Sequence, residues 1–255
     1  MGPIANADAA MQRFRAVVAY DGTDFAGFQA QEHAAGELRT VQASLEGAVS
    51  LATGYPARVV GAGRTDRGVH ALGQVVHFDV PQDIAPRGSG MLSALNSRLP
   101  PDIRVLVIDP VSDEFHARFS ATSRRYHYTI ENALIGVPTN RRLAWNIRRP
   151  VDVMAMNDAL GRIVGSHDFA VFGVRVGSDP TQRVVLGARV SATVLPRNEQ
   201  FIDRDAARRL PAARAVCGEI WHTSRQCDPP HGLCLVHVAY DGTRLSPRYR
   251  ASPGS

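Results

Sequence analysis

The most informative part of this sequence is residues 61–71, which read Gly61-Ala62-Gly63-Arg64-Thr65-Asp66-Arg67-Gly68-Val69-His70-Ala71. Residues 73–80, Gly-Gln-Val-Val-His-Phe-Asp-Val, follow at once, and their alternation of side chains predicts a half-buried strand. Asp66 is therefore expected in a glycine-flanked loop that enters a strand. Such a loop can bring backbone close to a ligand and present one carboxylate to it. The same pattern also fits an ordinary turn with a solvated Asp.

Strands and helices mix along the chain without a strict β-α-β order. No phosphate-binding glycine fingerprint follows a strand, so the pattern predicts an α+β fold rather than a doubly wound sheet. Strands are expected at 14–20, 103–108, 126–130, 184–194 and 233–238. One helix is expected after Thr40 and another around Leu92–Leu99. A third begins after Asp152, with Met156, Ala159, Leu160 and Ile163 facing inward and Gly165 past its end.

The composition points to a water-soluble chain with a basic surface. The 255 residues are 44% hydrophobic and carry a formal net charge of +5, and every basic residue is Arg. Arg side chains match the geometry of phosphates and stack on bases, so the sign of the charge suits a nucleic-acid partner. Neither a membrane span nor a secretory signal is visible, and three cysteines do not suggest a disulfide scaffold. A cytoplasmic protein is expected.

The run at 61–71 resembles the active-site motif of the tRNA pseudouridine synthase A family, roughly A-G-R-T-D-x-G-V-H-A followed by G-Q-V-x-H-F. Further blocks resemble that family in the right order, and together they are more specific than any one of them. The blocks are residues 20–29 (Tyr-Asp-Gly-Thr-Asp-Phe-Ala-Gly-Phe-Gln), 40–46, 95–103, 115–121, 125–128, 165–169, 183–184 and 229–233. The resemblance covers about residues 14–190 and 229–240.

The resemblance implies a pseudouridine synthase fold, in which two similar α/β halves share a central, mainly antiparallel sheet with an RNA-binding cleft. Residues 13–110 would form the N-terminal half with the Asp loop, and residues 111–244 the C-terminal half with the substrate Tyr strand. Residues 245–255 would form a loose tail. The sequence Val-Ala-Tyr-Asp-Gly-Thr at 18–23 recurs at 238–243. This echo fits either a duplication or a coincidence between two strand-turn segments.

The resemblance also implies roles for individual residues. Asp66 would be the catalytic nucleophile, and Arg64, two residues before it on the same side of an extended segment, would hold the carboxylate in its charged form. Tyr126 would stack on the target base, and Leu233 would pack in the uracil pocket. Without the resemblance, Arg64 fits a surface residue, Tyr126 a half-buried strand residue, and Leu233 plain core.

The implied activity is the isomerisation of uridine to pseudouridine at positions 38–40 in the anticodon stem-loop of tRNA. The family acts as a homodimer and needs neither a cofactor nor a metal. Seven arginines would contact RNA phosphates or form an ordinary solvated face. They are Arg118, Arg124, Arg125, Arg141, Arg142, Arg148 and Arg149.

Residues 196–228 depart from the family pattern. A family helix in this region supplies an Arg that pairs with the catalytic Asp. Here the stretch Phe201-Ile-Asp-Arg-Asp-Ala-Ala-Arg-Arg-Leu210 precedes Pro211 and lacks an apolar helix face. Arg208 is the best stand-in, with Arg209 as a second choice, and the stretch is expected to be irregular. Divergence and a local sequence error both fit. The alternative function is a tRNA-binding protein or folding aid with lost or weak catalysis.

A cluster of Cys and His residues near the C-terminus permits a third interpretation, a zinc-dependent RNA-binding module. Its spacings contain no C-x2-C pair followed by a matching pair, which disfavours a zinc site. The six residues are Cys217, His222, Cys227, His231, Cys234 and His237.

Overall fold

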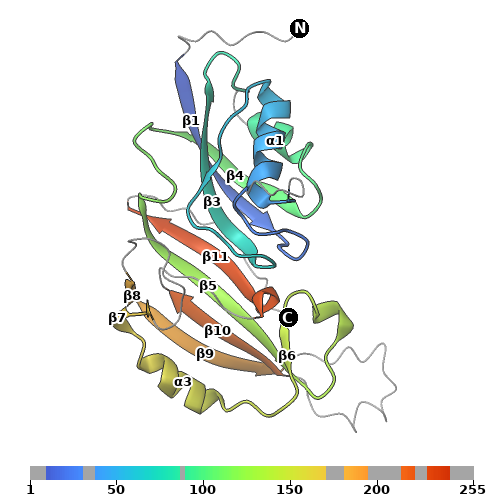
Figure 1. Ribbon diagram of the computed structural model, residues 1–255, viewed down its shortest axis with the longest axis vertical. Coiled ribbons are helices and arrows are strands. Elements are labelled where there is room, and N and C mark those ends of the chain that lie inside the picture. Colours follow the sequence, from blue (N-terminus) through green and yellow to red (C-terminus); the bar gives the residue numbers. More distant parts are fainter. Residues whose placement is uncertain are drawn as a thin grey trace, which may run out of the picture. The chain divides into compact units, whose positions relative to one another are not determined.

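The computed structural model describes residues 10–30, 38–86, 90–170, 181–194, 214–221 and 229–241 (Figure 1). The chain divides into two compact units. The first unit comprises Met1–Arg67, Ala71–Ser123 and His237–Ser255, and the second comprises Gly68–His70 and Arg124–Val236. The last strand, β11 (Leu233–Tyr240), gives residues to both units. The predicted division into two related halves at residue 110 stays a prediction.

The first unit is built on three antiparallel strands in the order β4-β1-β3. These are β1 (Met11–Tyr20), β3 (His70–Pro81) and β4 (Ile103–Val111), and the two-residue β2 (Val60–Gly61) pairs with β3. Phe14 on β1 lies opposite Phe78 on β3, and their rings stack with centroids 5.8 Å apart. The strands predicted at 14–20 and 103–108 are confirmed.

Two α-helices lie in the part of the first unit that the structure describes. Helix α1 (Val41–Thr53) begins where the sequence predicts, because the Thr40 side chain accepts a hydrogen bond from the Ala43 amide, and it ends at Gly54 with φ 74°. Helix α2 (Gly90–Asn96) stops before the prolines at 100 and 101. The Asn96 side chain explains this early end, since it donates to and accepts from the Val105 backbone on β4.

Strand β3 is buried on both faces, so the predicted half-buried strand is wrong. Val75, Val76 and Phe78 are all buried, and so is His77 on the face expected to be polar. The cause lies far away in sequence. Segment 115–117 covers that face, with the Phe115 and His116 rings against the His77 ring.

In its described residues, the second unit contains strands in the order β11-β5-β10-β9 and one α-helix. The strands are β5 (Ala121–Asn132), β9 (Gly187–Val194) and β10 (Arg214–Trp221), in addition to β11; β6 (Trp145–Ile147) pairs in parallel with β5. Strands β7 (Gly165–Asp168) and β8 (Gln182–Val185) form a separate antiparallel pair. The mixed sheet and the few helices agree with the predicted α+β class.

Helix α3 (Val153–Gly161) corrects part of the sequence prediction. Asp152 caps it as expected, accepting from the amides of Met154 and Ala155. Met156 and Leu160 pack on a small core, but Ala159 is exposed, which contradicts its predicted inward position. Val153 also packs on this core, and the Asn157 side chain donates to and accepts from the Val190 backbone on β9.

Gly165 lies past the end of the helix as predicted, since the helix closes at Arg162 in a right-handed conformation and Gly165 opens β7. Two further features of the second unit differ from the sequence prediction. The single strand predicted at 184–194 is two strands, β8 and β9, separated by the exposed Leu186. Part of the unusual segment 196–228 forms β10, a strand that the sequence did not predict. Residues 201–213, including Arg208, and the tail at 245–255 lie outside the described residues.

Candidate active site

The Asp66 loop occupies the positions between β2 and β3, as the sequence predicts. Along it, Arg64 is exposed, Thr65 is buried and Asp66 is exposed again. This alternation agrees with the expectation that Arg64 and Asp66 share one side of an extended segment. The loop therefore presents a carboxylate and a guanidinium to its surroundings, while Thr65 ties it to the fold.

Thr65 is held by Tyr20, the last residue of β1, and by Phe28 in the segment that follows β1. The Tyr20 hydroxyl and the Thr65 hydroxyl oxygen lie 2.8 Å apart in a buried hydrogen bond, and the Phe28 amide donates to the Thr65 carbonyl at 2.9 Å. Gly27 has φ 114°, and a Cβ there would lie 3.2 Å from the Thr65 carbonyl oxygen. Only glycine fits this position, because it needs both the positive φ and the close approach of two backbones.

The other side of the loop is fixed by β3. Gln74 is fully buried, and its Nε2 donates to the Gly63 carbonyl at 2.8 Å and to the Tyr20 hydroxyl at 3.4 Å. The Ala62 amide donates to the Val75 carbonyl at 2.8 Å. We call Tyr20, Gly27, Phe28 and Gln74 the clamp, because they hold the backbone on which Asp66 stands.

The clamp is a feature that reasoning from the sequence missed. Residues 73–78 were recognised as the strand that follows the Asp66 loop and residues 20–29 as a separate block, but nothing in the sequence showed that either holds the loop. The available signal was the type of residue: a Gly between Ala26 and Phe28, and a Gln at 74 within an apolar strand. A buried Gln requires a polar partner, and a glycine beside an aromatic residue often marks a close backbone approach.

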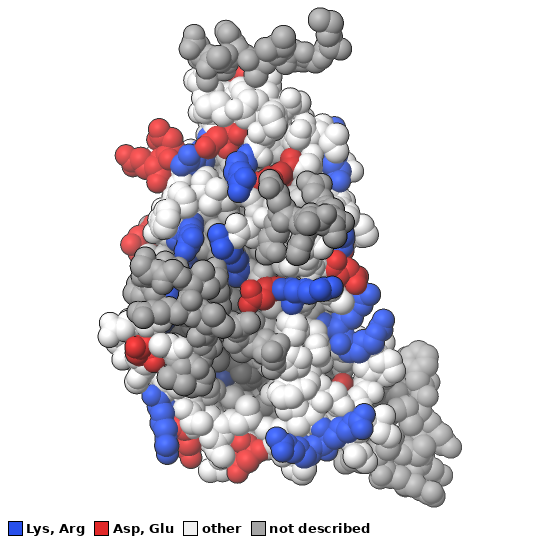
Figure 2. Space-filling view, viewed as in Figure 1, with Lys and Arg blue, Asp and Glu red and all other residues white. Residues whose placement is uncertain are grey.

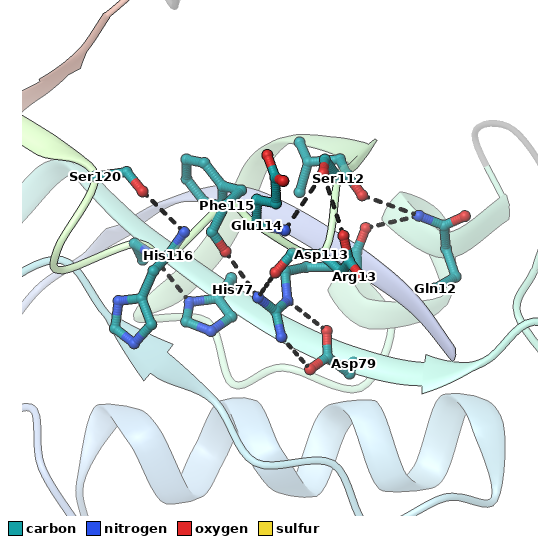
Figure 3. A network of polar contacts seen from close by, with 12 residues as sticks. Gln12, Arg13, His77, Asp79, Ser112, Asp113, Glu114, Phe115, His116 and Ser120 are labelled. Atoms are coloured by element: carbon teal, nitrogen blue, oxygen red, sulfur yellow. Dashed lines mark hydrogen bonds and ion pairs between the residues drawn. The ribbon is translucent and has the colours of Figure 1, made fainter. Parts of the chain in front are cut away.

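A second polar network lies on the buried face of β3 that segment 112–120 covers (Figure 3). The Ala117 amide donates to Nδ1 of His77 at 3.1 Å, so the proton of the neutral ring is on Nε2. Arg13 binds both carboxylate oxygens of Asp79 at 2.7 Å and donates to the carbonyls of Asp113 and Phe115. These bonds fix the segment to the sheet.

The two histidines of this network are held neutral. Burial lowers the pKa of His77 from 6.5 to about 4, helped by the nearby His116 and Arg13. Burial also lowers the pKa of His116, and the charges of Arg13 and Arg118 act in the same direction. At neutral pH both imidazoles are therefore uncharged aromatic rings.

The lowered pKa of His77 predicts a stability that depends on pH. Between about pH 6.5 and pH 4, His77 is protonated in the unfolded chain but stays neutral in the folded chain. The contribution of His77 to the free energy of unfolding is therefore fully present above this window and is lost as the pH falls through it. At about 1.4 kcal/mol per pKa unit, His77 is expected to contribute a loss of about 3 kcal/mol in the free energy of unfolding. The free energy of unfolding is measured with urea at pH 7 and at pH 4. In His77→Asn, whose amide oxygen can accept from Ala117, its decrease between the two pH values should be smaller than in the wild type by that amount. An equal decrease in both proteins would show that His77 is not the source of the pH dependence.

The residues expected to contact the substrate base lie in the second unit. Tyr126 is half-buried on β5, opposite Ile220 on β10. Leu233 is half-buried directly after the short 3-10 helix Pro230–Gly232. The Tyr128 hydroxyl donates to the Pro229 carbonyl at 2.8 Å, and a Cβ on Gly232 would meet the Tyr128 ring at 2.8 Å. The turn before Leu233 is thus seated on the strand that carries Tyr126, while the roles of both residues stay predictions.

The Cys/His cluster is only partly visible. His222 and Cys227 lie outside the described residues, and nothing is described of the Cys217 side chain. Among the residues that the structure describes, no group of three or more His, Cys, Asp or Glu is placed to hold a metal ion. Within the same residues, none of the helices is both long enough and apolar enough to cross a bilayer.

Comparison with known proteins places these features in a family. The sequence profile described as tRNA pseudouridine synthase matches residues 16–120, which contain the clamp and Asp66. Relatives named tRNA pseudouridine synthase A include one from Latilactobacillus sakei, 45% identical over 65% of each chain. Another, from Solidesulfovibrio magneticus, is 48% identical over 64% of this chain and 59% of its own. The chain thus spans somewhat less than two thirds of the length of these two relatives.

A third relative is matched over its full length. The tRNA pseudouridine synthase A of Rhodopseudomonas palustris is 35% identical over 91% of this chain and 100% of its own. Among solved structures, an unknown protein from Galdieria sulphuraria aligns over 84% of this chain and 83% of its own, at 11% identity. The TM-score of this alignment is 0.23, so the similarity is too weak to support any argument. With its full-length match and the Asp66 loop in the expected place, this chain belongs to the tRNA pseudouridine synthase A family.

Proposed function

We propose that this protein is a tRNA pseudouridine synthase that isomerises uridine to pseudouridine at positions 38–40 of the anticodon stem-loop. The observation that carries the proposal is the clamped loop, in which Tyr20 and Phe28 hold Thr65, Gln74 holds Gly63, and Asp66 stays exposed. The clamp residues come from two blocks that resemble the family, 20–29 and 73–78. A loop fixed to this extent can hold a reacting carboxylate in position without rearrangement.

The chemistry needs a carboxylate and a way to hold the base. The N1–C1′ bond of the uridine breaks, the base turns, and a C5–C1′ bond forms; C5 then loses its proton and N1 gains one. Asp66 would attack the nucleotide or stabilise its separated sugar and base, and Arg64, exposed on the same loop, would help to bind the substrate. No electrons are gained or lost overall, so the reaction requires no redox cofactor.

The base would be held by the second unit. Tyr126 would stack on the flipped uracil, and Leu233 would form an apolar wall of its pocket. In this proposal, residues 13–110 and 111–244 are related α/β halves whose shared sheet carries the RNA-binding cleft. An Arg that pairs with Asp66 would come from the segment containing Arg208.

Replacing Tyr126 separates stacking from hydrogen bonding. Tyr126→Phe keeps the ring and is expected to retain base capture, whereas Tyr126→Ala should lower kcat/KM for tRNA by about 5- to 150-fold, the equivalent of about 1–3 kcal/mol. The measurement is the initial rate of pseudouridine formation over a series of tRNA concentrations. If both variants behave like the wild type, the ring does not contact the base.

The proposed partner is tRNA, bound by a homodimer in the cytoplasm. Of the seven arginines between 118 and 149, five are exposed: Arg118, Arg125, Arg141, Arg148 and Arg149. On the face seen in Figure 2, Arg side chains are interspersed with carboxylates rather than gathered into one patch. Separate exposed arginines can contact individual phosphates of a folded RNA.

The direct test is incubation of the purified protein with unmodified tRNA transcripts, followed by chemical mapping of pseudouridine. The expected result is modification at one or more of positions 38, 39 and 40, and none in a transcript whose uridines at these positions are replaced by cytidine. Modification elsewhere would contradict the proposed position.

A second candidate function is supported by the departure of residues 196–228 from the family pattern. If no Arg from this segment reaches Asp66, the protein would bind tRNA or assist its folding with weak or lost catalysis. Tight binding of tRNA without detectable pseudouridine in the same test would favour this function.

A further inference from the structure

Phe119 is a large aromatic side chain that the first unit leaves 77% exposed. Single exposed apolar residues are common on protein surfaces and need no explanation by themselves. Phe119 differs because it is the outer member of a series of rings. Its centroid lies 4.4 Å from that of His116, with an interplanar angle of 31°, and His116 lies 4.7 Å from the buried His77.

The inner rings are fixed by hydrogen bonds. Nδ1 of His116 accepts from the amides of both Arg118 and Phe119 at 3.2 Å. The His116 amide donates to the Ser120 hydroxyl at 3.0 Å (Figure 3). The Ser120 amide closes the turn by donating to the His116 carbonyl at 2.9 Å. The backbone that carries Phe119 is therefore folded tightly around the imidazole on which its ring rests.

The turn is also fastened to the sheet of the first unit. Tyr240 donates from its buried hydroxyl to the Ala117 carbonyl at 2.7 Å, and the Ala117 amide is the donor to His77. Arg13 holds the preceding residues through their carbonyls. An exposed ring mounted in this way has little conformational freedom left to lose when it contacts a ligand.

A cation stands beside the exposed ring. The guanidinium carbon of Arg118 lies 5.7 Å from the Phe119 centroid, within the range of a cation–π contact, and Arg118 is itself exposed. An aromatic face with an adjacent Arg is the arrangement that proteins use to bind an unpaired base together with its phosphate. The net charge of +5 of the whole chain favours an anionic partner over an uncharged apolar peptide.

We propose that the turn at His116–Ser120 is a second nucleotide-binding element, in which Phe119 stacks on an unpaired base of the RNA and Arg118 contacts the neighbouring phosphate. The choice of RNA as the ligand rests on the proposed function. The contact itself needs no catalysis and no particular base, because every base offers a flat face to the ring. This element would bind an unpaired nucleotide of the substrate RNA other than the uridine that is isomerised.

The test compares Phe119→Leu, which keeps apolar bulk but loses the ring, with Phe119→Trp, which keeps a ring. The probes are an unmodified tRNA transcript, a fully paired RNA duplex of similar length, and a short oligoribonucleotide that contains 2-aminopurine. Phe119→Leu should weaken binding of the tRNA by about 5- to 150-fold and leave the duplex affinity unchanged. It should also relieve the quenching of 2-aminopurine that stacking produces in the wild type, and Phe119→Trp should preserve both properties.

Leu51→Ala serves as the matched control, because Leu51 is 71% exposed on α1 in the same unit and should have no effect on any probe. Unchanged tRNA binding and quenching in Phe119→Leu would overturn the proposal, as would an equal loss of affinity for the duplex. The test distinguishes failure of this proposal from failure of the proposed function. If Phe119→Leu forms pseudouridine and binds tRNA with wild-type affinity, only the stacking element is refuted. Loss of stacking in a protein that never forms pseudouridine would refute only the catalysis.

Discussion

Asp66→Asn is expected to abolish pseudouridine formation while tRNA affinity stays within a few-fold of the wild type. The amide keeps the shape of the side chain but cannot supply the negative charge that attacks or stabilises the sugar. The side chain is exposed and the clamp holds the backbone of Thr65, so the substitution should leave folding intact. Pseudouridine mapping over a long incubation measures the activity, and a filter-binding titration measures the affinity.

Two further variants make this result specific. Asp83→Asn neutralises another exposed carboxylate of the first unit, in the turn after β3, and should retain full activity. Asp66→Ala should be as inactive as Asp66→Asn, which excludes recovery of the carboxylate by deamidation. Turnover near the wild-type rate in either Asp66 variant would refute the assignment of Asp66 as the catalytic residue.

The elements that the sequence predicted well are those determined by neighbours along the chain. Thr40 begins α1 because its own hydroxyl accepts from an amide three residues later, and Asp152 begins α3 in the same way. The loop that carries Asp66 was likewise predicted from its flanking glycines and the strand that follows, and Gly68 indeed has φ 78°. Local hydrogen bonds and local backbone geometry leave a direct mark on the sequence.

The features that the sequence did not predict depend on contacts between distant segments. His77 looked like the polar face of a half-buried strand, but segment 115–117, about 40 residues later, covers it and lowers its pKa. Strand β10 forms in a stretch with little apolar pattern because β5 and β9 pair with it on both sides. Ladder hydrogen bonds come from the backbone and need no particular side chain, so such a strand leaves a weak signal in the sequence.

The clamp depends both on residues that the sequence shows and on contacts between distant segments that only the structure shows. Its residues were visible as separate blocks, but their function follows only from the distances between them: Thr65 within hydrogen-bonding distance of Tyr20 and Phe28, and Gly63 within reach of Gln74. A reacting group that must be positioned to a fraction of an ångström requires a fixed backbone beneath it. Gly27 is the most sensitive point of this support, because its Cα faces the peptide units before and after Asp66.

Gly27→Ala is therefore expected to lower turnover by about 100-fold, because a methyl group here displaces the loop that carries Asp66, and a small displacement of a reacting group has an effect of that size. The new Cβ would lie 3.2 Å from the Thr65 carbonyl oxygen and 3.6 Å from the Asp66 carbonyl carbon, and φ 114° is strained for any residue with a side chain. The free energy of unfolding should fall by about 1–3 kcal/mol, and tRNA affinity should change by only a few-fold.

Gly54→Ala is the control that separates strain from position. Gly54 also has a positive φ, 74°, but nothing lies within 4 Å of its added Cβ, and it ends α1 away from the loop. This variant should lose about 1–2 kcal/mol of stability and keep its turnover at a temperature where it is folded. The two variants are compared by the initial rate of pseudouridine formation at saturating tRNA. If turnover falls equally in both, loss of stability alone explains the effect, and the clamp does not position Asp66.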